Sequence, residues 1–191
     1  MRILVVDNGG QWTHREWRVL RDLGVETSIV PNSTPLESIS ADGLVLSGGS
    51  PRVGLDEEAM GMCGEYIDKL DVPILGICAG HQYMALRLGE KAVSSATPEF
   101  GKTLVSVIDE DDLFIGLPET FVAWESHNDE VTELPPGFKL LANSETCPVQ
   151  AMKHETRPLY GLQFHPEVEH TDNGYEIFQA FLDVCEARKK G

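Results

Sequence analysis

Cys78 is the residue of this chain whose sequence context most favours chemistry. Residues 76–80 read Gly-Ile-Cys-Ala-Gly and lie between an apolar run and a segment with helical character. In a Gly-x-nucleophile-x-Gly turn the two glycines allow a sharp bend, so that the nucleophile projects above the edge of a sheet at the start of a helix. The helix dipole and the free N–H groups at that point favour a thiolate. We therefore predict that Cys78 is a nucleophile, although most cysteines are simply structural.

A thiolate of this kind needs a base, and His165 is the candidate. It follows an apolar stretch within residues 161–168, which read Gly-Leu-Gln-Phe-His-Pro-Glu-Val. In an extended chain, residues two apart project to the same side, so Glu167 can follow His165 toward one site. Pro166 restricts both its own φ and the conformation of the preceding residue. A carboxylate placed there would orient the imidazole and stabilise its charged form, which predicts a Cys-His-Glu triad.

Two motifs together carry a resemblance to a known family. Residues 76–82, Gly-Ile-Cys-Ala-Gly-His-Gln, combined with residues 161–168, resemble the class I glutamine amidotransferase family. The resemblance covers essentially the whole chain, and the joint presence of both motifs is highly specific. It implies that Cys78, His165 and Glu167 hydrolyse the side-chain amide of glutamine through a glutamyl thioester. It implies neither a metal nor a cofactor on this chain.

The resemblance also implies an oxyanion hole, which preorganised N–H donors must form for the tetrahedral intermediate. One donor would be the N–H of Ala79, the residue after the nucleophile. The other would be the N–H of Gly49, in the Ser-Gly-Gly-Ser-Pro turn of residues 47–51. That turn commonly reads Gly-Gly-Pro in the family, whereas this chain has Ser50 and the proline one place later.

The resemblance further implies which residues bind glutamine. Gln82 would contact the substrate, and Ser126, His127, Asn128 and Asp129 would hold its amino-acid end. The family often reads Ser-His-Gly-Asp there, so Asn128 replaces a glycine; asparagine accepts positive φ relatively well. His127 lacks the Pro-Glu neighbours of the predicted base, so we assign it to substrate contact or to loop structure.

Several other segments resemble the glutaminase part of GMP synthases within this family. They are residues 7–11, 99–101, 144–148 and 167–174. In that branch, ammonia aminates adenylylated xanthosine monophosphate (XMP). The sequence contains no Ser-Gly-Gly-x-Asp-Ser pyrophosphatase loop, so the resemblance implies a separate ATP pyrophosphatase subunit that carries ATP and Mg.

Three alternatives to this interpretation remain open at the level of the sequence. The chain could be the glutaminase component of anthranilate or aminodeoxychorismate synthase. It could be a catalytically silent regulatory protein, although the intact triad argues against that. A peptidase or a γ-glutamyl hydrolase on the same fold is less favoured, because residues 82 and 126–129 suit free glutamine.

The elements that must position these residues follow a regular alternation in the first half of the chain. Apolar strands are predicted at residues 2–7, 25–30, 43–47 and 73–78, and helices at 12–23, 34–39, 57–70 and 80–88. Strands that alternate with helices at this interval indicate a parallel sheet with helices on both faces.

The pattern changes after Gly89. Shorter strands are predicted at residues 103–108, 121–124, 138–142, 149–152 and 159–164, followed by an amphipathic helix over residues 174–187. No repeat, low-complexity stretch or linker divides the chain. We therefore predict one α/β domain over residues 1–191, with a flavodoxin-like mixed, mostly parallel sheet.

Composition limits the partners. Of the 191 residues, 41% are hydrophobic, which is enough for one buried core, and 31 acidic against 15 basic residues give a net charge of -16. This charge argues against nucleic acid and anionic membranes as partners. We expect a cytoplasmic protein, because no secretory signal or membrane span is recognisable. The four cysteines show no Cys-x-x-Cys pair, so no zinc site is expected.

Overall fold

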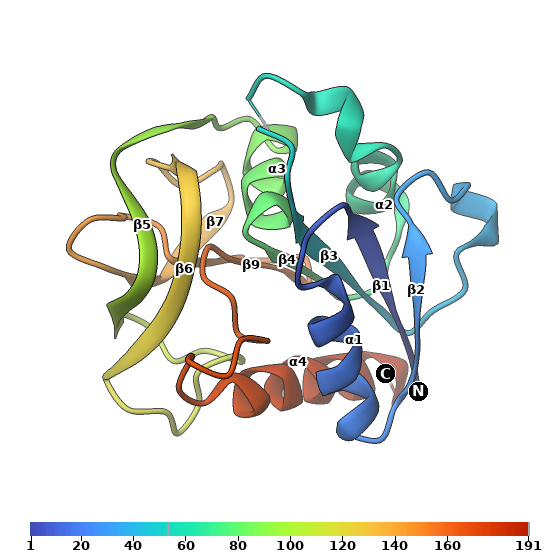
Figure 1. The fold of residues 1–191 in the computed structure, drawn as a ribbon. Coiled ribbons are helices and arrows are strands. Elements are labelled where there is room, and N and C mark those ends of the chain that lie inside the picture. The colour runs from blue at the N-terminus through green and yellow to red at the C-terminus, as the bar shows by residue number, and fades with distance from the viewer. Residues whose placement is uncertain (53, 191) are drawn as a thin grey trace.

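Five parallel strands form one side of a nine-stranded sheet (Figure 1). The computed structural model describes residues 1–52 and 54–190. The parallel strands lie in the order β2 (Glu26–Pro31), β1 (Arg2–Asn8), β3 (Gly43–Gly49), β4 (Ile74–Ile77) and β9 (Leu159–Leu162). The sequence predicts a strand in each of these five segments, which the structure confirms. The segments that follow β1, β3, β4 and β9 therefore meet at the carboxyl edge of the sheet, where ligands bind in open α/β sheets.

The other four strands are antiparallel and continue the same sheet. Beyond β9 come β8 (Ala151–His154), β7 (Phe138–Asn143), β5 (Ala92–Val107) and β6 (Thr120–Val131). Four of the eight strand pairings among the described residues are parallel and four are antiparallel, so the sheet is mixed, with a larger antiparallel share than predicted.

Strands β5 and β6 are much longer than their sequences suggested. They have 16 and 12 residues and pair with each other over most of their length. The additional residues of β5 include serines and a proline, which have low strand propensity. Pairing with β6 on both sides of an irregularity between Ser94 and Glu99 provides the hydrogen bonds and neighbours that local propensity does not reveal.

Helices cover both faces of the sheet (Figure 1). Helices α1 (Thr13–Asp22) and α4 (Gly174–Lys190) pack on one face, and α2 (Cys63–Lys69) and α3 (Ala79–Arg87) pack on the other. Side chains of β1 alternate accordingly, because Ile3 belongs to the core under α1 and α4, whereas Leu4 belongs to the core under α2 and α3. The predicted α/β domain with helices on both faces is confirmed. None of the helices in the described part of the chain is long and apolar enough to cross a membrane.

Two predicted helices differ in the structure. Residues 34–39 form only a single 3-10 turn, Leu36–Ser38, and the Thr34 hydroxyl donates to the Pro31 carbonyl at 2.7 Å instead of capping a helix. Residues 57–70 form a 3-10 turn, Glu57–Met60, and then α2. The break lies at Gly61, whose φ of 54° is left-handed and ends the first turn.

Candidate active site

The sharp turn around Cys78 is present, and its backbone is strained. Cys78 lies between β4 and α3 with φ 47° and ψ -103°, a conformation that side chains other than glycine rarely adopt. A Cβ on Gly76 would lie 2.7 Å from the Gly80 backbone, and one on Gly80 would lie 2.3 Å from the Leu46 carbonyl oxygen. Both glycines are therefore required for the close approach of strand and helix. Such strain is typical of functional sites.

His165 and Glu167 form a buried pair. Nδ1 of His165 lies 2.7 Å from Oε1 of Glu167. The backbone between them is held at two points, because His165 N–H donates to the Trp124 carbonyl at 3.0 Å and the Thr171 hydroxyl donates to the His165 carbonyl at 2.7 Å. Since Nδ1 is engaged by the carboxylate, Nε2 is the nitrogen left for proton exchange with Cys78.

Electrostatics favours the imidazolium form of His165. Burial lowers its pKa, but the negative charge of Glu167 and hydrogen bonds with Cys78 and Glu167 outweigh burial, so that the pKa lies well above its ordinary value. A histidine held in this way can carry the proton of a neighbouring thiol. The Glu167 carboxylate is therefore placed to orient the imidazole and to favour its charged form.

One cavity of about 290 Å³ joins the triad residues. Five of the predicted site residues line this cavity: Cys78, His165, Glu167, Gly49 and Ser126. The Cys78 Sγ lies 4.0 Å from the Ser126 carbonyl oxygen. The rest of the lining comes from the loop after β1, from α1 and from the turn after β3: Gly9, Gly10, Gln11, Trp12, Thr13, Glu16, Gly48 and Ser50. The structure therefore brings together segments that lie far apart in the sequence.

Of the two predicted oxyanion donors, Gly49 lines this cavity, and Ala79 directly follows Cys78, which also lines it. Ala79 is the first residue of α3, where backbone N–H groups have no partner within the helix. Gly49 ends β3, and its turn is held against β1, because Asn8 N–H donates to the Ser47 hydroxyl at 3.0 Å and Asn8 Nδ2 donates to the Ser47 carbonyl at 2.9 Å. Gly48 lies between these groups, and a Cβ there would be 3.0 Å from the His165 ring.

The predicted glutamine-binding residues fall into two groups. Ser126 lines the cavity, but the side chains of the others do not contribute to its described walls. Gln82 Nε2 instead donates to the Asp129 carbonyl at 2.5 Å, which ties α3 to β6. The Asp129 carboxylate pairs with Arg52 at 2.7 Å. Asn128 is exposed within β6 and does not have a positive φ, so the glycine-like conformation is not required of it.

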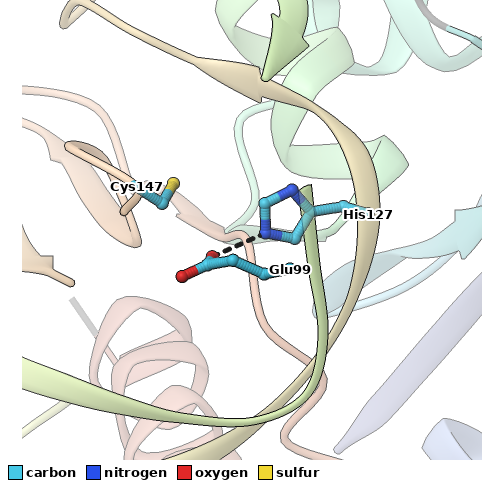
Figure 2. A group of neighbouring side chains, drawn as sticks. All are labelled: Glu99, His127 and Cys147. Carbon is cyan, nitrogen blue, oxygen red and sulfur yellow. Dashed lines mark hydrogen bonds and ion pairs between the residues drawn. The ribbon is translucent and has the colours of Figure 1, made fainter. Parts of the chain in front are cut away.

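His127 takes part in a different buried network (Figure 2). Its Nε2 lies 2.8 Å from Glu99 Oε2 and 3.3 Å from Glu125 Oε2, and its Nδ1 lies 3.1 Å from the Asp129 carbonyl. Burial lowers the pKa of His127, but hydrogen bonds with Glu125 and Glu99 outweigh it and raise the pKa to about 10. The side chain is therefore a charged group within a buried network, and it does not line the described cavity.

Glu99, His127 and Cys147 also have the spacing of metal ligands, because their candidate ligand atoms lie within 4.8 Å of one another (Figure 2). The protonation states do not suit a metal. A doubly protonated imidazole has no free lone pair, and burial raises the pKa of the Cys147 thiol. The Glu99 oxygens are already occupied by hydrogen bonds from Ser144, Thr146, His127 and Gln150. We interpret the cluster as an ion-pair network.

Two residues near the triad were not singled out from the sequence. The Trp12 ring packs edge-on against His165, with ring centroids 4.5 Å apart, and Glu16 is 1% exposed beside the same pair. A sequence signal for Glu16 existed. It lies three residues after Thr13 and four before Leu20, which places it on the buried face of α1.

Comparison with known proteins gives concordant findings. The family model described as glutamine amidotransferase class-I matches residues 4–185. The chain is 54% identical over 191 residues to the A subunit of the glutamine-hydrolyzing GMP synthase of Thermoplasma volcanium, covering 100% of this chain and 95% of that protein. It is 52% identical over 189 residues to the protein of the same name from Thermococcus kodakarensis, covering 96% and 98%.

Solved structures agree with these relatives. A crystal structure from Thermoplasma acidophilum, described as the A subunit of a GMP synthase, superposes with a TM-score of 0.95 at 53% identity, covering 100% of this chain and 96% of that one. A glutamine amidotransferase from Thermotoga maritima has a TM-score of 0.76 at 22% identity, covering 100% and 86%, which shows a shared fold.

Proposed function

Because this chain belongs to the class I glutamine amidotransferase family, we propose that Cys78, His165 and Glu167 are the triad with which it hydrolyses glutamine. The chain is a glutamine amidotransferase and supplies the glutaminase activity of GMP synthesis. The observation that carries the residue assignment is the strained Cys78 at the start of α3, in one cavity with the buried His165–Glu167 pair.

The reaction follows from this geometry. The Cys78 sulfur attacks the side-chain amide carbon of glutamine, while the Cys78 proton is held on His165 Nε2. The imidazolium then gives this proton to the amide nitrogen, the C–N bond breaks, and ammonia leaves a glutamyl thioester on Cys78. A water molecule, deprotonated by His165, attacks the thioester and releases glutamate and the free thiol.

The oxyanion of both tetrahedral intermediates needs fixed donors. We assign them to the backbone N–H groups of Ala79 and Gly49. We assign the amino-acid end of glutamine to the backbone of residues 126–129. The tie between the Gln82 side chain and the Asp129 carbonyl gives Gln82 a role in holding that segment in place.

The acceptor chemistry requires a partner. The relatives are each named as one lettered subunit of an enzyme, which implies a second polypeptide. We propose that it is an ATP pyrophosphatase that binds ATP and Mg, adenylylates XMP and uses the ammonia to form GMP. The net charge of -16 favours a basic docking patch on that partner. The same proposal includes a cytoplasmic location, because the four cysteines are free thiols and a reducing compartment preserves the nucleophile.

Replacing Cys78 by alanine tests the assignment. We expect Cys78→Ala, reconstituted with the ATP pyrophosphatase subunit, to lose glutamine-dependent GMP formation and to retain ammonia-dependent formation. Both nitrogen donors are assayed at saturating ATP and XMP. Cys185→Ala is the matched control, since Cys185 is a buried cysteine of α4 outside the described cavity and should leave both rates intact.

A substantial glutamine-dependent rate in Cys78→Ala would remove Cys78 from its role. Loss of both rates would point to failed assembly of the two subunits. The rival assignment is tested with the wild-type chain. Combined with an anthranilate or aminodeoxychorismate synthase component in place of the pyrophosphatase, it should support no glutamine-dependent synthesis by that component.

A further inference from the structure

Glu16 is a buried carboxyl group inside the active site to which the reaction above gives no role. It projects from the first turn of α1, it is 1% exposed, and it lines the same cavity as Cys78 and His165. Its Oε2 is buried and has no hydrogen-bond partner among the described residues. A carboxyl group that served only to fill the core would be replaced at lower cost by an apolar side chain.

The bonded oxygen of Glu16 indicates what the group does. Oε1 accepts a hydrogen bond from the Gly48 N–H at 3.3 Å. Gly48 in turn lies against the reacting groups, because a Cβ built on it would be 3.0 Å from His165 Cε1 and 3.7 Å from Cys78 Cβ. It directly precedes Gly49, whose N–H we assign to the oxyanion hole. Glu16 therefore contacts the backbone that separates the triad from the oxyanion donor.

The charges that face Glu16 come from two segments. They are Glu167 and His165 from the segment after β9, and Asp7 from β1. Burial and the negative charge of Glu167 raise the pKa of Glu16, and they outweigh the opposing effects of His165 and of the Gly48 N–H. The group consequently retains a proton at pH values where an ordinary glutamate is ionised, and in that form it is close in shape and charge to glutamine.

We infer that Glu16 is a positioning residue of the glutaminase reaction: it holds the Gly48 N–H and so keeps the glycine turn seated against His165 and Cys78. This inference rests on the proposed function. In this role the side chain acts through the backbone of Gly48 and Gly49. The start of α1 supports the site twice, since Trp12, which directly precedes this helix, restrains the His165 ring.

Three variants of α1 separate positioning from packing. Glu16→Met keeps an unbranched side chain of similar length and removes the acceptor, whereas Glu16→Gln keeps the acceptor and removes the ionisable proton. Asp22→Asn, an exposed carboxylate at the end of the same helix, is the control. Glutamate release is measured with the pyrophosphatase subunit, ATP and XMP present, and kcat and KM are determined separately.

We expect Glu16→Met to lower kcat by at least about 10-fold, with KM changed by less than about 3-fold, because the donor geometry matters most in the transition state. Glu16→Gln should restore kcat to within about 3-fold of the wild-type value. When the pKa of a carboxyl group is higher in the folded than in the unfolded protein, the free energy of unfolding falls as pH rises from the ordinary pKa to the raised one. The melting temperature of Glu16→Gln should therefore exceed that of the wild type by an amount that grows with pH.

Each outcome decides a separate point. A wild-type kcat in Glu16→Met, or equal losses in the Met and Gln variants, would overturn the positioning role. If Glu16→Met fails to fold, Glu16→Asp tests the same contact with the Gly48 N–H, because its carboxyl group is one methylene shorter. A wild-type kcat in Glu16→Asp would also overturn the positioning role. Absence of glutamate release by the wild type under these conditions would instead contradict the proposed function.

Discussion

Two buried histidine–glutamate pairs of this molecule differ in their surroundings. His165 has one carboxylate partner two residues away and faces the cavity that contains Cys78. His127 lies between the carboxylates of Glu99 and Glu125. It is 3% exposed and does not line that cavity. The pKa of each histidine is raised, so a raised pKa does not distinguish a reacting group from a structural one. What distinguishes them is access to a nucleophile.

The contrast extends to the hydrogen bonds of the glutamates. The oxygens of Glu99 receive hydrogen bonds from Ser144, Thr146, Gln150 and His127, which fully occupies that carboxylate. In Glu167, by comparison, Oε2 has no partner among the described residues. Glu125, the second carboxylate beside His127, also has no hydrogen-bond partner among the described residues at either oxygen, so hydrogen-bond satisfaction alone does not separate the two pairs. Access to Cys78 remains the difference between them. The predictions below test this division.

The largest effect should come from His165→Ala. Loss of the base leaves Cys78 without a proton acceptor, and removal of a triad member costs on the order of 10³-fold or more in kcat. Glutamate release under saturating glutamine measures it. His14→Ala, an exposed histidine of α1, serves as the control, and a rate within about 10-fold of wild type for His165→Ala would contradict the role of the base.

Coupling to the partner should change the glutaminase rate by roughly 100-fold, if docking favours the assembled site by ~3 kcal/mol. The His165–Glu167 bond is present in the chain alone, so we expect the coupling to act on the turn at residues 48–49 and on residues 126–129. Glutamate release is followed as the pyrophosphatase subunit, ATP and XMP are added in turn. Added salt should weaken the association through the acidic surface. Full activity of the isolated chain would disprove the coupling.

Glu167→Gln should have an intermediate effect, about 10- to 100-fold in kcat, smaller than that of His165→Ala. The amide keeps the shape of the carboxylate but removes the charge that stabilises the imidazolium. KM for glutamine should change little, because Glu167 is bonded to His165 and affects chiefly the orientation and charge of the base. A change confined to KM would show that the assigned role is wrong.

His127→Leu should affect stability most and kcat least. It leaves Glu99 and Glu125 buried without their cation, and breaking a buried pair costs about 3–5 kcal/mol in the free energy of unfolding. Urea denaturation measures this loss. If His127→Leu abolished kcat without loss of stability, His127 would belong to the reaction.

The pH dependence of this stability has a defined sign. The folded pKa of His127 is raised to about 10, so its contribution is complete below its ordinary pKa near 6.5 and is lost as pH rises through about 10. The alkaline loss of stability should therefore be smaller in His127→Leu than in the wild type.

Local patterns in the sequence determined much of the molecule. The continuous apolar run of β1 and the glycines around Cys78 predicted the strand and the sharp turn, since both depend on neighbouring residues and their allowed dihedral angles. The two-residue spacing of His165 and Glu167 predicted their pairing for the same reason. The turn at Cys78, the contact between His165 and Glu167, and the parallel half of the sheet could therefore be predicted.

Contacts between distant residues were decided by the tertiary structure alone. The lengths of β5 and β6 depend on their mutual pairing, and Glu16 meets Gly48 across 32 residues. The charge of His127 depends on Glu125, two residues away, and also on Glu99, 28 residues away. Residues 34–39 had the composition of a helix start, but the structure forms only one 3-10 turn there. Such contacts arise when the sheet brings strand ends together and excludes water, which changes both the pKa of a buried group and its available partners. No spacing along the chain encodes that proximity.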